Sequence, residues 1–384
     1  MIKNKKILNR INKVMLEQRR ISYNNLRLGI PQPSPIKKFL KYLTSFSYYQ
    51  VNNIGTHTLH KNIPLNSCKA LENEVIKWLG KLYHNNNLDG YLCSGASEGN
   101  IMALWIAREK LKSLDKPLVI SHFNCHYSID KACKLLNLPL IKTSEKSWNL
   151  PLTRSLIESI LNKQSSNPLI IVATLGHTQT GINDHIVSIS NFIKSQNRPC
   201  FLHIDVAING LILPLFEKNY PFDFRSNEVQ TITGDFHKFG FAPYPAGFFL
   251  CKKGLQKNIE SIINYAGIID NTLLGSRPGY IVPTIWANIY YYGIKHYKRL
   301  YLQILNKKEK FLNILQKKDI MFFNEKYSPI VVVILKKRLS FKIEKKFRLH
   351  GIIRKINNKY VYTYALYFYP ESKLKNYLSI LNSI

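Results

Sequence analysis

The sequence predicts an α/β fold built on a largely parallel sheet. Seven short apolar runs follow one another between residues 90 and 251, and stretches with helical spacing separate them. Buried strands that alternate with helices form parallel sheets, whose chemistry lies in the loops at the carboxyl ends of the strands. The runs are Gly90–Cys93, Leu118–Ser121, Leu138–Thr143, Leu169–Thr174, Phe201–Asp205, Gln230–Thr233 and Gly247–Cys251.

The segments before and after these runs have a different pattern of predicted helices and strands. Residues 1–50 predict an N-terminal helical arm, because three prolines between positions 31 and 35 break its helical pieces. Residues 51–285 form the predicted large domain, which opens with a helix at Lys69–Tyr83. Residues 286–384 predict a small α+β domain, with a long helix from Pro283 to about Leu315, strands at Ile330–Leu335 and Lys359–Tyr369, and a short final helix.

Composition excludes several classes of protein. The 384 residues are 45% hydrophobic and 12% aromatic, which suffices for a large core and argues against disorder. The six cysteines form no C-x-x-C and no zinc-type spacing with histidine, so we expect reduced thiols and no metal. The N-terminus has no apolar core of a secretory signal, and no run approaches the ~20 residues of a membrane helix. We therefore expect a cytoplasmic protein that makes no membrane contact.

The net charge of +32 comes from 55 Lys and Arg against 23 Asp and Glu. Such a balance is typical of proteins that bind nucleic acid or an acidic membrane surface. Only 13 of the basic residues are Arg, however. The Lys content is high together with the Asn and Ile contents, which indicates a drift of the whole composition. A polyanion-binding surface is the alternative. It would lie in residues 1–50, which contain eleven basic residues and a single acidic one, Glu17.

Two loops that follow predicted strands carry candidate binding residues. The stretch from Ser94 to Asn100 joins a strand to a helix with small residues, and backbone N–H groups at a helix start favour a phosphate. It matches neither dinucleotide-binding nor P-loop patterns, and simple helix capping is the alternative. Asp205 ends a buried strand, where its carboxylate either holds a protonated heterocycle nitrogen or caps the next helix.

A third loop places a lysine among aromatic side chains. Lys238 follows a strand and is flanked by Phe236, Phe239 and Phe241, which predicts a lowered pKa and a nucleophilic amine. A solvated surface lysine is the alternative, since the chain has 42 of them. Phosphate loop, histidine, acid and lysine together occur in the order used by fold-type I pyridoxal phosphate enzymes.

From about residue 45 to 290 the sequence resembles the pyridoxal-dependent (group II) amino acid decarboxylases, most closely their histidine and serine branch. Seven motifs in order carry the resemblance: Val51–Gly55, Gly90–Asn100, His126–Ala132, Ala173–Gly181, His203–Ala207, His237-Lys238 and Asp270–Gly279. The resemblance implies the fold-type I transferase fold, with a mostly parallel seven-stranded sheet and a small α+β C-terminal domain. One departure stands next to the lysine: Asp235-Phe236 precede His237, where the family has Gly or Pro and then a small residue.

The resemblance also implies pyridoxal 5'-phosphate as the cofactor and a role for each site residue. Lys238 would hold the cofactor through its amine and act in proton transfer, and Asp205 would pair with the ring nitrogen. His126 would stack on one face of the ring and Ala207 would cover the other, with Thr178 nearby. Tyr265 would protonate the substrate carbon. The phosphate would be taken by Ala96, Ser97, His237 and, from the neighbouring subunit, Ser276.

The activity that the resemblance implies is that of a carboxy-lyase of the EC 4.1.1 type. It would convert an L-amino acid to its amine and CO₂ with no metal, and L-histidine to histamine is the first expectation. Serine, an aromatic amino acid, or another pyridoxal phosphate-dependent carbon-carbon cleavage are the alternatives. We expect a homodimer with its active site at the interface, a small-molecule substrate, and no role for nucleic acid. A degenerate relative that binds RNA through its basic arm is the hypothesis of another class.

Overall fold

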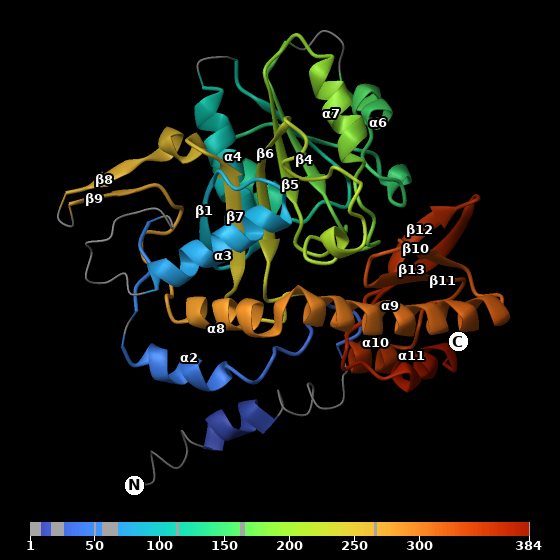
Figure 1. Ribbon diagram of the computed structural model, residues 1–384. Helices are drawn as coiled ribbons and strands as arrows, with labels where there is room; N and C mark the ends of the chain where they lie inside the picture. The colour runs from blue at the N-terminus through green and yellow to red at the C-terminus, as the bar shows by residue number, and fades with distance from the viewer. Residues whose placement is uncertain are drawn as a thin grey trace. The chain divides into compact units, whose positions relative to one another are not determined.

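The structure of the protein is a computed structural model, shown in Figure 1. It describes residues 9–16, 27–49, 51–55, 68–112, 115–161, 166–264 and 267–383. The chain divides into two compact units, which we describe separately. One comprises Pro35–Arg299 and Glu325–Ser328, and the other comprises Met1–Ser34, Leu300–Asn324 and Pro329–Ile384.

The larger unit holds a seven-stranded sheet in the order β1-β7-β6-β5-β4-β2-β3. Strands β2 to β6 pair in parallel, whereas β7 runs antiparallel to both β1 and β6. The predicted α/β class and all seven predicted strands are confirmed. Their bounds are β1 (Leu88–Cys93), β2 (Leu118–Ser121), β3 (Leu140–Lys142), β4 (Leu169–Thr174), β5 (Cys200–Asp205), β6 (Val229–Asp235) and β7 (Gly247–Lys252).

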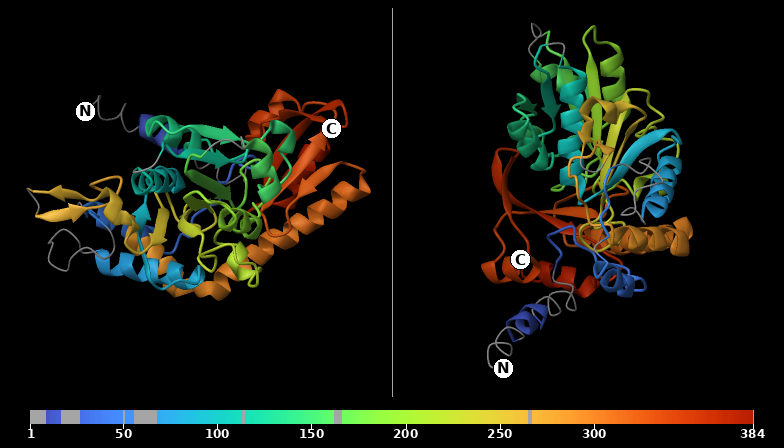
Figure 2. Two further views of the ribbon diagram at one scale, coloured as in Figure 1. Left: turned by 90° about the horizontal axis from the view of Figure 1, so that it is seen from above. Right: turned by 90° about the vertical axis from the view of Figure 1, so that its left-hand side faces the viewer.

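Helices cover both faces of this sheet, with α3 and α4 on opposite sides (Figure 2). Helix α4 packs on β5, β6 and β7, and its residues Met102, Ala103 and Leu104 are buried. The helices of this unit are α2 (Leu40–Ser47), α3 (Lys69–Leu82), α4 (Ala96–Lys110), α5 (Ser128–Leu135), α6 (Arg154–Ile160), α7 (Ile186–Lys194) and α8 (Ile281–Ala287). Short 3₁₀ turns η1 (Glu145–Ser147), η2 (Leu213–Leu215) and η3 (Leu255–Ile259), and the hairpin of β8 (Ser261–Ile263) and β9 (Ile268–Asp270), complete it.

Helix α4 approaches the sheet more closely than a side chain would permit. A Cβ on Gly99 would lie 1.8 Å from Thr233 Oγ1 on β6. A second close approach lies at the start of the same helix, where a Cβ on Gly247 would lie 2.4 Å from the Cα of Gly95. Glycine at these positions therefore brings the first turn of α4 directly against the ends of β6 and β7.

The smaller unit contains a four-stranded antiparallel sheet in the order β10-β11-β13-β12. Its strands are β10 (Phe322–Asn324), β11 (Ile330–Leu335), β12 (Ile352–Ile356) and β13 (Lys359–Tyr367), and its helices include α10 (Phe341–Phe347) and α11 (Leu374–Leu381). Leu28 is fully buried and its carbonyl accepts a hydrogen bond from the Tyr367 N–H at 2.7 Å. Residues 27–34 therefore pack on this sheet. The domain boundaries predicted near residues 50 and 285 stay predictions.

The long helix predicted from Pro283 to about Leu315 is interrupted. It consists of α8, a π-helical turn η4 (Asn288–Tyr292) and α9 (Gly293–Lys317). Gly293 has a φ of 65°, a left-handed conformation that breaks the regular helix at this point. The sequence pattern did not predict the break, because apolar spacing continues on both sides of it.

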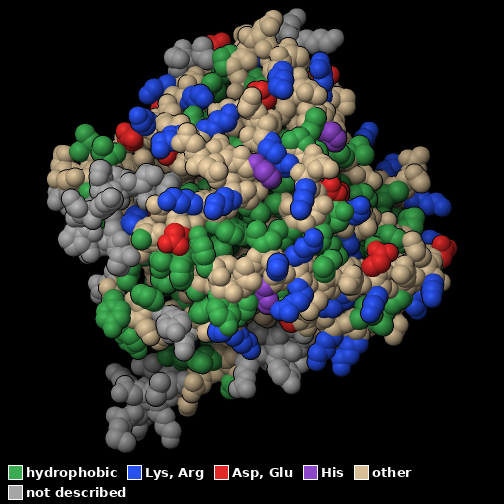
Figure 3. Space-filling view, in the orientation of Figure 1, with side chains coloured by type: hydrophobic (Ala, Val, Ile, Leu, Met, Phe, Trp, Pro, Cys, Tyr) green, Lys and Arg blue, Asp and Glu red, His purple; other side chains and the backbone are tan. Residues whose placement is uncertain are grey.

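Lys and Arg side chains are scattered across the face drawn in Figure 3, among neutral and apolar ones. In the described part of the chain, no group of three or more His, Cys, Asp and Glu could hold a metal ion. No described helix has both the length and the apolar character to cross a membrane. The six cysteines are free, and five of them are buried.

Candidate active site

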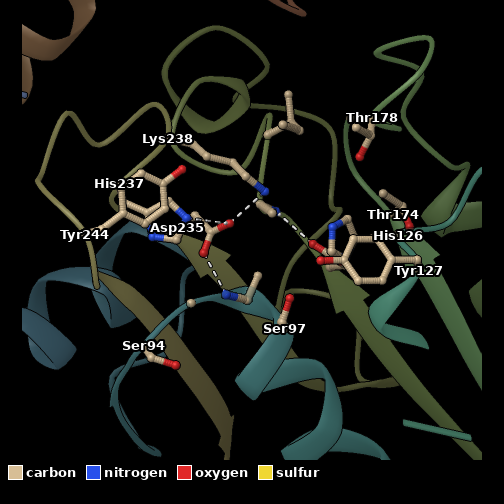
Figure 4. Close-up of a pocket in the computed structure, with 16 residues that line it drawn as sticks. Ser94, Ser97, His126, Tyr127, Thr174, Thr178, Asp235, His237, Lys238 and Tyr244 are labelled. Carbon is tan, nitrogen blue, oxygen red and sulfur yellow. Dashed lines mark hydrogen bonds and ion pairs between the residues drawn. The ribbon is translucent and has the colours of Figure 1, made fainter. Parts of the chain in front are cut away.

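A cavity of about 340 Å³ opens at the carboxyl ends of β4, β5 and β6, where parallel sheets place their chemistry. This volume lies within the range of small-molecule sites. Residues from the five loops that follow β1, β2, β4, β5 and β6 surround it (Figure 4). Its walls are formed by Ser94, Gly95, Ala96, Ser97, His126, Tyr127, Thr174, Gly176, Thr178, Asp205, Ala207, Ile208, Asp235, His237, Lys238 and Tyr244.

Lys238 follows the end of β6, and its side chain is only 13% exposed. Its Nζ lies 2.7 Å from Asp235 Oδ2, so the two form a buried ion pair (Figure 4). Burial lowers the pKa of Lys238, but the charges of Asp235 and Asp205 outweigh this effect and raise it. The lowered pKa predicted for this lysine is therefore wrong. The flanking phenylalanines are buried as expected, yet the carboxylates beside the amine stabilise its charged form.

Asp235 also contacts the start of α4. Its Oδ1 accepts a hydrogen bond from the Ala96 N–H at 2.6 Å, and its Oδ2 lies 3.6 Å from His237 Nε2. Burial raises the pKa of Asp235, but Lys238 and His237 lower it below the usual value. Asp235 was noted in the sequence only as a departure from the family. In the structure it joins the predicted lysine loop to the predicted phosphate loop.

The predicted phosphate loop lies at the N-terminus of α4, as expected. Ala96 and Ser97 both line the cavity. Glu98 turns away from it, because Glu98 Oε2 accepts from both the N–H and the hydroxyl of Ser94, at 2.8 and 2.7 Å. Glu98 thus closes the turn while the Ser97 side chain faces the cavity (Figure 4), so capping of the helix leaves its start open to the predicted phosphate.

His126, Asp205 and Ala207 lie around the same space. Asp205 is 2% exposed, and its Oδ1 accepts the Ala207 N–H at 3.0 Å. The other oxygen, Oδ2, accepts from Asn100 Nδ2 at 2.9 Å. His126 Nδ1 lies 2.9 Å from the Ser128 hydroxyl, and burial lowers the pKa of this imidazole. Asp205 and His126 are thus each held by a residue that does not line the cavity, Asn100 and Ser128 respectively.

Tyr244 and Thr174 also line the cavity, although the sequence did not single them out. The ring of Tyr244 stacks on His237 with centroids 3.9 Å apart. Thr174 ends β4. A search of every predicted strand end for polar residues would have found Thr174. The position of Tyr244 depends on the loop after Lys238, and no sequence signal that we recognise predicts it.

Two predicted residues are absent from this list for different reasons. Tyr265 lies outside the described residues. Ser276 does not line the cavity, and its hydroxyl accepts a hydrogen bond from Asn52 Nδ2 at 3.0 Å. Its expected contribution to a neighbouring subunit stays a prediction.

The residues present fit pyridoxal phosphate. Thr174 Oγ1 and His237 Nδ1 are buried polar atoms at the cavity wall, and neither has a hydrogen-bond partner among the described residues. Unpaired buried polar atoms are costly unless a ligand satisfies them. An amine, a carboxylate and a helix N-terminus, which suit an aldehyde, a ring nitrogen and a phosphate respectively, lie around the same cavity.

Comparison with known proteins identifies a family for this chain. The family model described as the pyridoxal-dependent decarboxylase conserved domain matches residues 51–336. A histidine decarboxylase of Vibrio anguillarum is 29% identical over 297 residues, 76% of this chain and 75% of that protein. A probable L-tyrosine/L-aspartate decarboxylase of Methanococcus aeolicus is 34% identical over 255 residues, 62% of this chain and 65% of that protein.

Solved structures show the same fold. L-methionine decarboxylase from Streptomyces sp.590 superposes with a TM-score of 0.84 over 98% of this chain and 94% of that chain, at 16% identity. With a family match over most of the chain, the expected fold-type I architecture and the cofactor are confirmed. The chain belongs to the pyridoxal-dependent decarboxylase family and is a pyridoxal phosphate-dependent carboxy-lyase that acts on an amino acid.

Proposed function

We propose that the protein converts an L-amino acid to its amine and CO₂, with L-histidine as the first candidate substrate. The observation that carries the proposal is the single cavity around which Lys238, Asp205, His126 and the α4 N-terminus lie. Histidine is supported by relatives from two Vibrio species that are named histidine decarboxylases, at 29% and 28% identity. The tyrosine/aspartate relative and a tryptophan decarboxylase of Clostridium sporogenes, 29% identical, support an aromatic or acidic substrate as the alternative.

Pyridoxal phosphate, when bound, withdraws the electrons that CO₂ leaves behind on the substrate carbon. In the proposal, residues of this chain hold the cofactor and set its orientation. Asp205 holds a proton on the ring nitrogen, because its carboxylate is buried and fixed by two N–H donors. His126 would pack against one face of the ring and Ala207 against the other. Ser97, His237 and the start of α4 would bind the phosphate.

Proton transfer at the substrate carbon falls to Lys238 and Tyr265. For Lys238 the proposal is supported by its place in the cavity lining and by its raised pKa, because its ammonium form carries the proton that an amine product requires. The role of Tyr265 rests on the resemblance alone, since this residue lies outside the described part of the chain. Asp235, which pairs with Lys238, keeps a negative charge close to the amine.

The test is a panel of the twenty amino acids, with CO₂ release and amine formation measured for each. We expect one or a few to react, and Lys238→Ala to lose both the reaction and the visible absorbance of the bound cofactor. Lys146→Ala removes an exposed lysine from η1 and serves as the matched control. If no amino acid releases CO₂ while the absorbance is intact, decarboxylation is wrong for this chain and only the cofactor assignment stands.

Tyr265→Phe separates decarboxylation from an oxidative outcome on the same site. Loss of the proton donor is expected to shift the product from amine toward aldehyde, because the unprotonated substrate carbon is then open to oxidation by dissolved dioxygen, and hydrolysis releases the aldehyde and ammonia. An unchanged product would remove Tyr265 from the proposed mechanism and leave Lys238 as the donor.

We further propose that the protein works as a homodimer in the cytoplasm, with Ser276 contributing to the partner's site. The helix over residues 9–16 supports a dimer, because Ile11 and Val14, three residues apart and hence on one face, are 51% and 63% exposed. The free cysteines are consistent with a reducing compartment.

A further inference from the structure

Asn100 lies in the second turn of α4 and is fully buried, yet it does not line the cavity. Three polar side chains converge on its amide. Asn100 Nδ2 lies 2.8 Å from Ser128 Oγ and 2.9 Å from Asp205 Oδ2, and Asn100 Oδ1 lies 2.8 Å from His203 Nε2. Asparagine has a low helix propensity, so the local preference of the helix does not explain why this residue is here.

The hydrogen bonds of this amide fix the direction of every neighbouring proton. A carboxylate only accepts, so the NH₂ group of Asn100 must face Asp205, and its second hydrogen goes to the oxygen of Ser128. The amide oxygen then accepts, which requires a hydrogen on His203 Nε2. An amide turned the other way would place its oxygen against the Asp205 carboxylate.

His203 continues the network away from the cavity. With a hydrogen on Nε2, its Nδ1 accepts from the Thr231 hydroxyl at 2.8 Å. Burial lowers the pKa of His203 to about 4, so the imidazole is neutral at pH 7 and donates a single hydrogen, as the arrangement requires. The side chain of His203 belongs to β5, two residues before Asp205.

Ser128 continues the network toward the cavity. Its oxygen accepts from Asn100, so its own hydrogen is free to go to His126 Nδ1 at 2.9 Å. His126 Nδ1 is thereby an acceptor, and a neutral His126 carries its hydrogen on Nε2. The two cavity residues on which the proposed chemistry depends most, Asp205 and His126, are thus connected through Ser128 and Asn100.

We propose that Asn100 is a positioning residue that fixes the Asp205 carboxylate and the His126 imidazole together, and sets the hydrogen each presents or accepts. This inference rests on the proposed roles of Asp205 and His126. Its structural basis is the four-member chain His203, Asn100, Ser128 and His126, with Asp205 as a branch at the amide. No member other than His126 and Asp205 contacts the cavity.

Three variants test separately the hydrogen bond from Asn100 to Asp205 and the connection through Ser128 to His126. Asn100→Ala removes the whole junction. Asn100→Asp keeps its shape but sets a second carboxylate against Asp205. Ser128→Ala cuts only the branch to His126. Asn288→Ala is the matched control, because Asn288 is an equally buried asparagine of the same unit that lies outside the cavity lining.

The measurements are the dissociation constant for pyridoxal phosphate, the position of its visible absorption maximum when bound, and kcat and KM with the best substrate. For Asn100→Ala we expect weaker cofactor binding and a kcat lower by about 10- to 100-fold, the range for loss of a hydrogen bond to a charged group. KM should change less than kcat, and the absorption maximum should move. Asn100→Asp should move it further, and Ser128→Ala should lower kcat with the maximum unchanged.

An Asn100→Ala protein with wild-type absorption, cofactor affinity and kcat, differing only in thermal stability, would overturn the proposal and make Asn100 a packing residue. Equal effects from Asn288→Ala would overturn it as well. If Asn100→Ala does not fold, Asn100→Asp and Ser128→Ala decide the matter by the same readouts. If the wild-type protein binds the cofactor but decarboxylates nothing, the proposed function fails while affinity and absorption still test Asn100.

Discussion

At Lys238 two opposing effects act on one amine. Burial disfavours the ammonium, while Asp235 at 2.7 Å and the charge of Asp205 favour it, and the carboxylates prevail. The amine must therefore lose a proton before it can attack an aldehyde. Asp235 thus governs how readily the site captures its cofactor, although a carboxylate at this position has no part in the roles that the family resemblance implies.

Asp235→Asn should lower the pKa of Lys238. The amide keeps an acceptor for the Ala96 N–H but removes the charge beside the amine. The rate at which cofactor-free protein captures pyridoxal phosphate, followed by absorbance across a pH series, should then reach half its maximum at a lower pH. Asp130→Asn, which removes an exposed partner of Lys142, is the control. An unchanged pH profile would show that Asp235 does not govern the amine.

The buried histidines predict an acid-sensitive fold. Burial lowers the pKa of His203 and of His122 to about 4, from 6.5. Between these pH values the unfolded chain binds protons that the folded chain does not, so the free energy of unfolding falls as the pH is lowered from 6.5 to 4. His203→Gln should reduce this loss by on the order of 3 kcal/mol in urea unfolding. His350→Gln, which removes an exposed imidazole, is the comparison, and an equal effect there would contradict the expectation.

At this scale the sequence predicted which residues meet but not their electrostatics. The sheet topology alone brings the strand-end residues Asp205 and Lys238 together, so both could be located from the pattern of strands. The pKa of Lys238 could not, because its sign depends on the distance to Asp235, which only the folded loop defines. The junction at Asn100 was equally inaccessible, since its partners lie 28 and 103–105 positions away.

Among the elements, α4 carries the largest share of the site. Its first turn offers the predicted phosphate donors, its second turn holds Asn100, and its inner face packs on three strands. The close contact at Gly99 sets the distance between helix and sheet, and thereby the distance between Asn100 and Asp205.

Gly99→Ala should be strongly destabilising for its size. The new methyl group would lie 1.8 Å from Thr233 Oγ1, so α4 or β6 must shift, and overpacking of this kind costs about 1–3 kcal/mol. Urea unfolding measures the loss, and reduced cofactor affinity should accompany it. Gly275→Ala is the control, because its nearest neighbour would be Asp270 Oδ2 at 3.7 Å. Equal stability of the two variants would show that α4 adjusts without cost.

The elements of the large sheet were largely predictable, because most of its strands are short apolar runs buried on both faces. The antiparallel direction of β7 was not stated, although only residues 236–246 separate β6 from β7 and a parallel crossover needs about a dozen or more. Strands β10 and β12 and helix α10 were missed. They are short, and β10 is half-buried throughout while β12 and α10 mix exposed with buried positions, so they leave no clear periodicity.

For the molecule as a whole, the charge of +32 has no role in the cavity, which uses one lysine, two aspartates and neutral donors. Basic side chains are spread over the face in Figure 3. This distribution supports the interpretation of a compositional background. A positive field also favours the approach of substrates and cofactors that carry carboxylate or phosphate.

The proposed dimer gives a prediction at the same scale. Ile11→Glu with Val14→Glu places two charges on the exposed apolar face of the helix over 9–16 and should shift the protein toward monomer. Light scattering after size exclusion, over a range of concentrations, measures the shift. Lys13→Glu changes the charge in the same helix and serves as the control. A double variant that stays dimeric at all concentrations would remove this helix from the interface.

The cavity has two kinds of wall. The first includes Gly95, whose backbone lies directly against that of Gly247. On one side the backbone of the predicted phosphate loop is set by contact with another backbone, and no side chain can be added there. On the other side the wall includes the side chains of Tyr127, Thr178 and Tyr244, which are partly or largely exposed, and that of Ile208, which is buried. A mutant library on this side-chain wall that leaves out Tyr244, because its ring stacks on His237, can therefore search for new substrates while the backbone of the predicted phosphate loop stays constant.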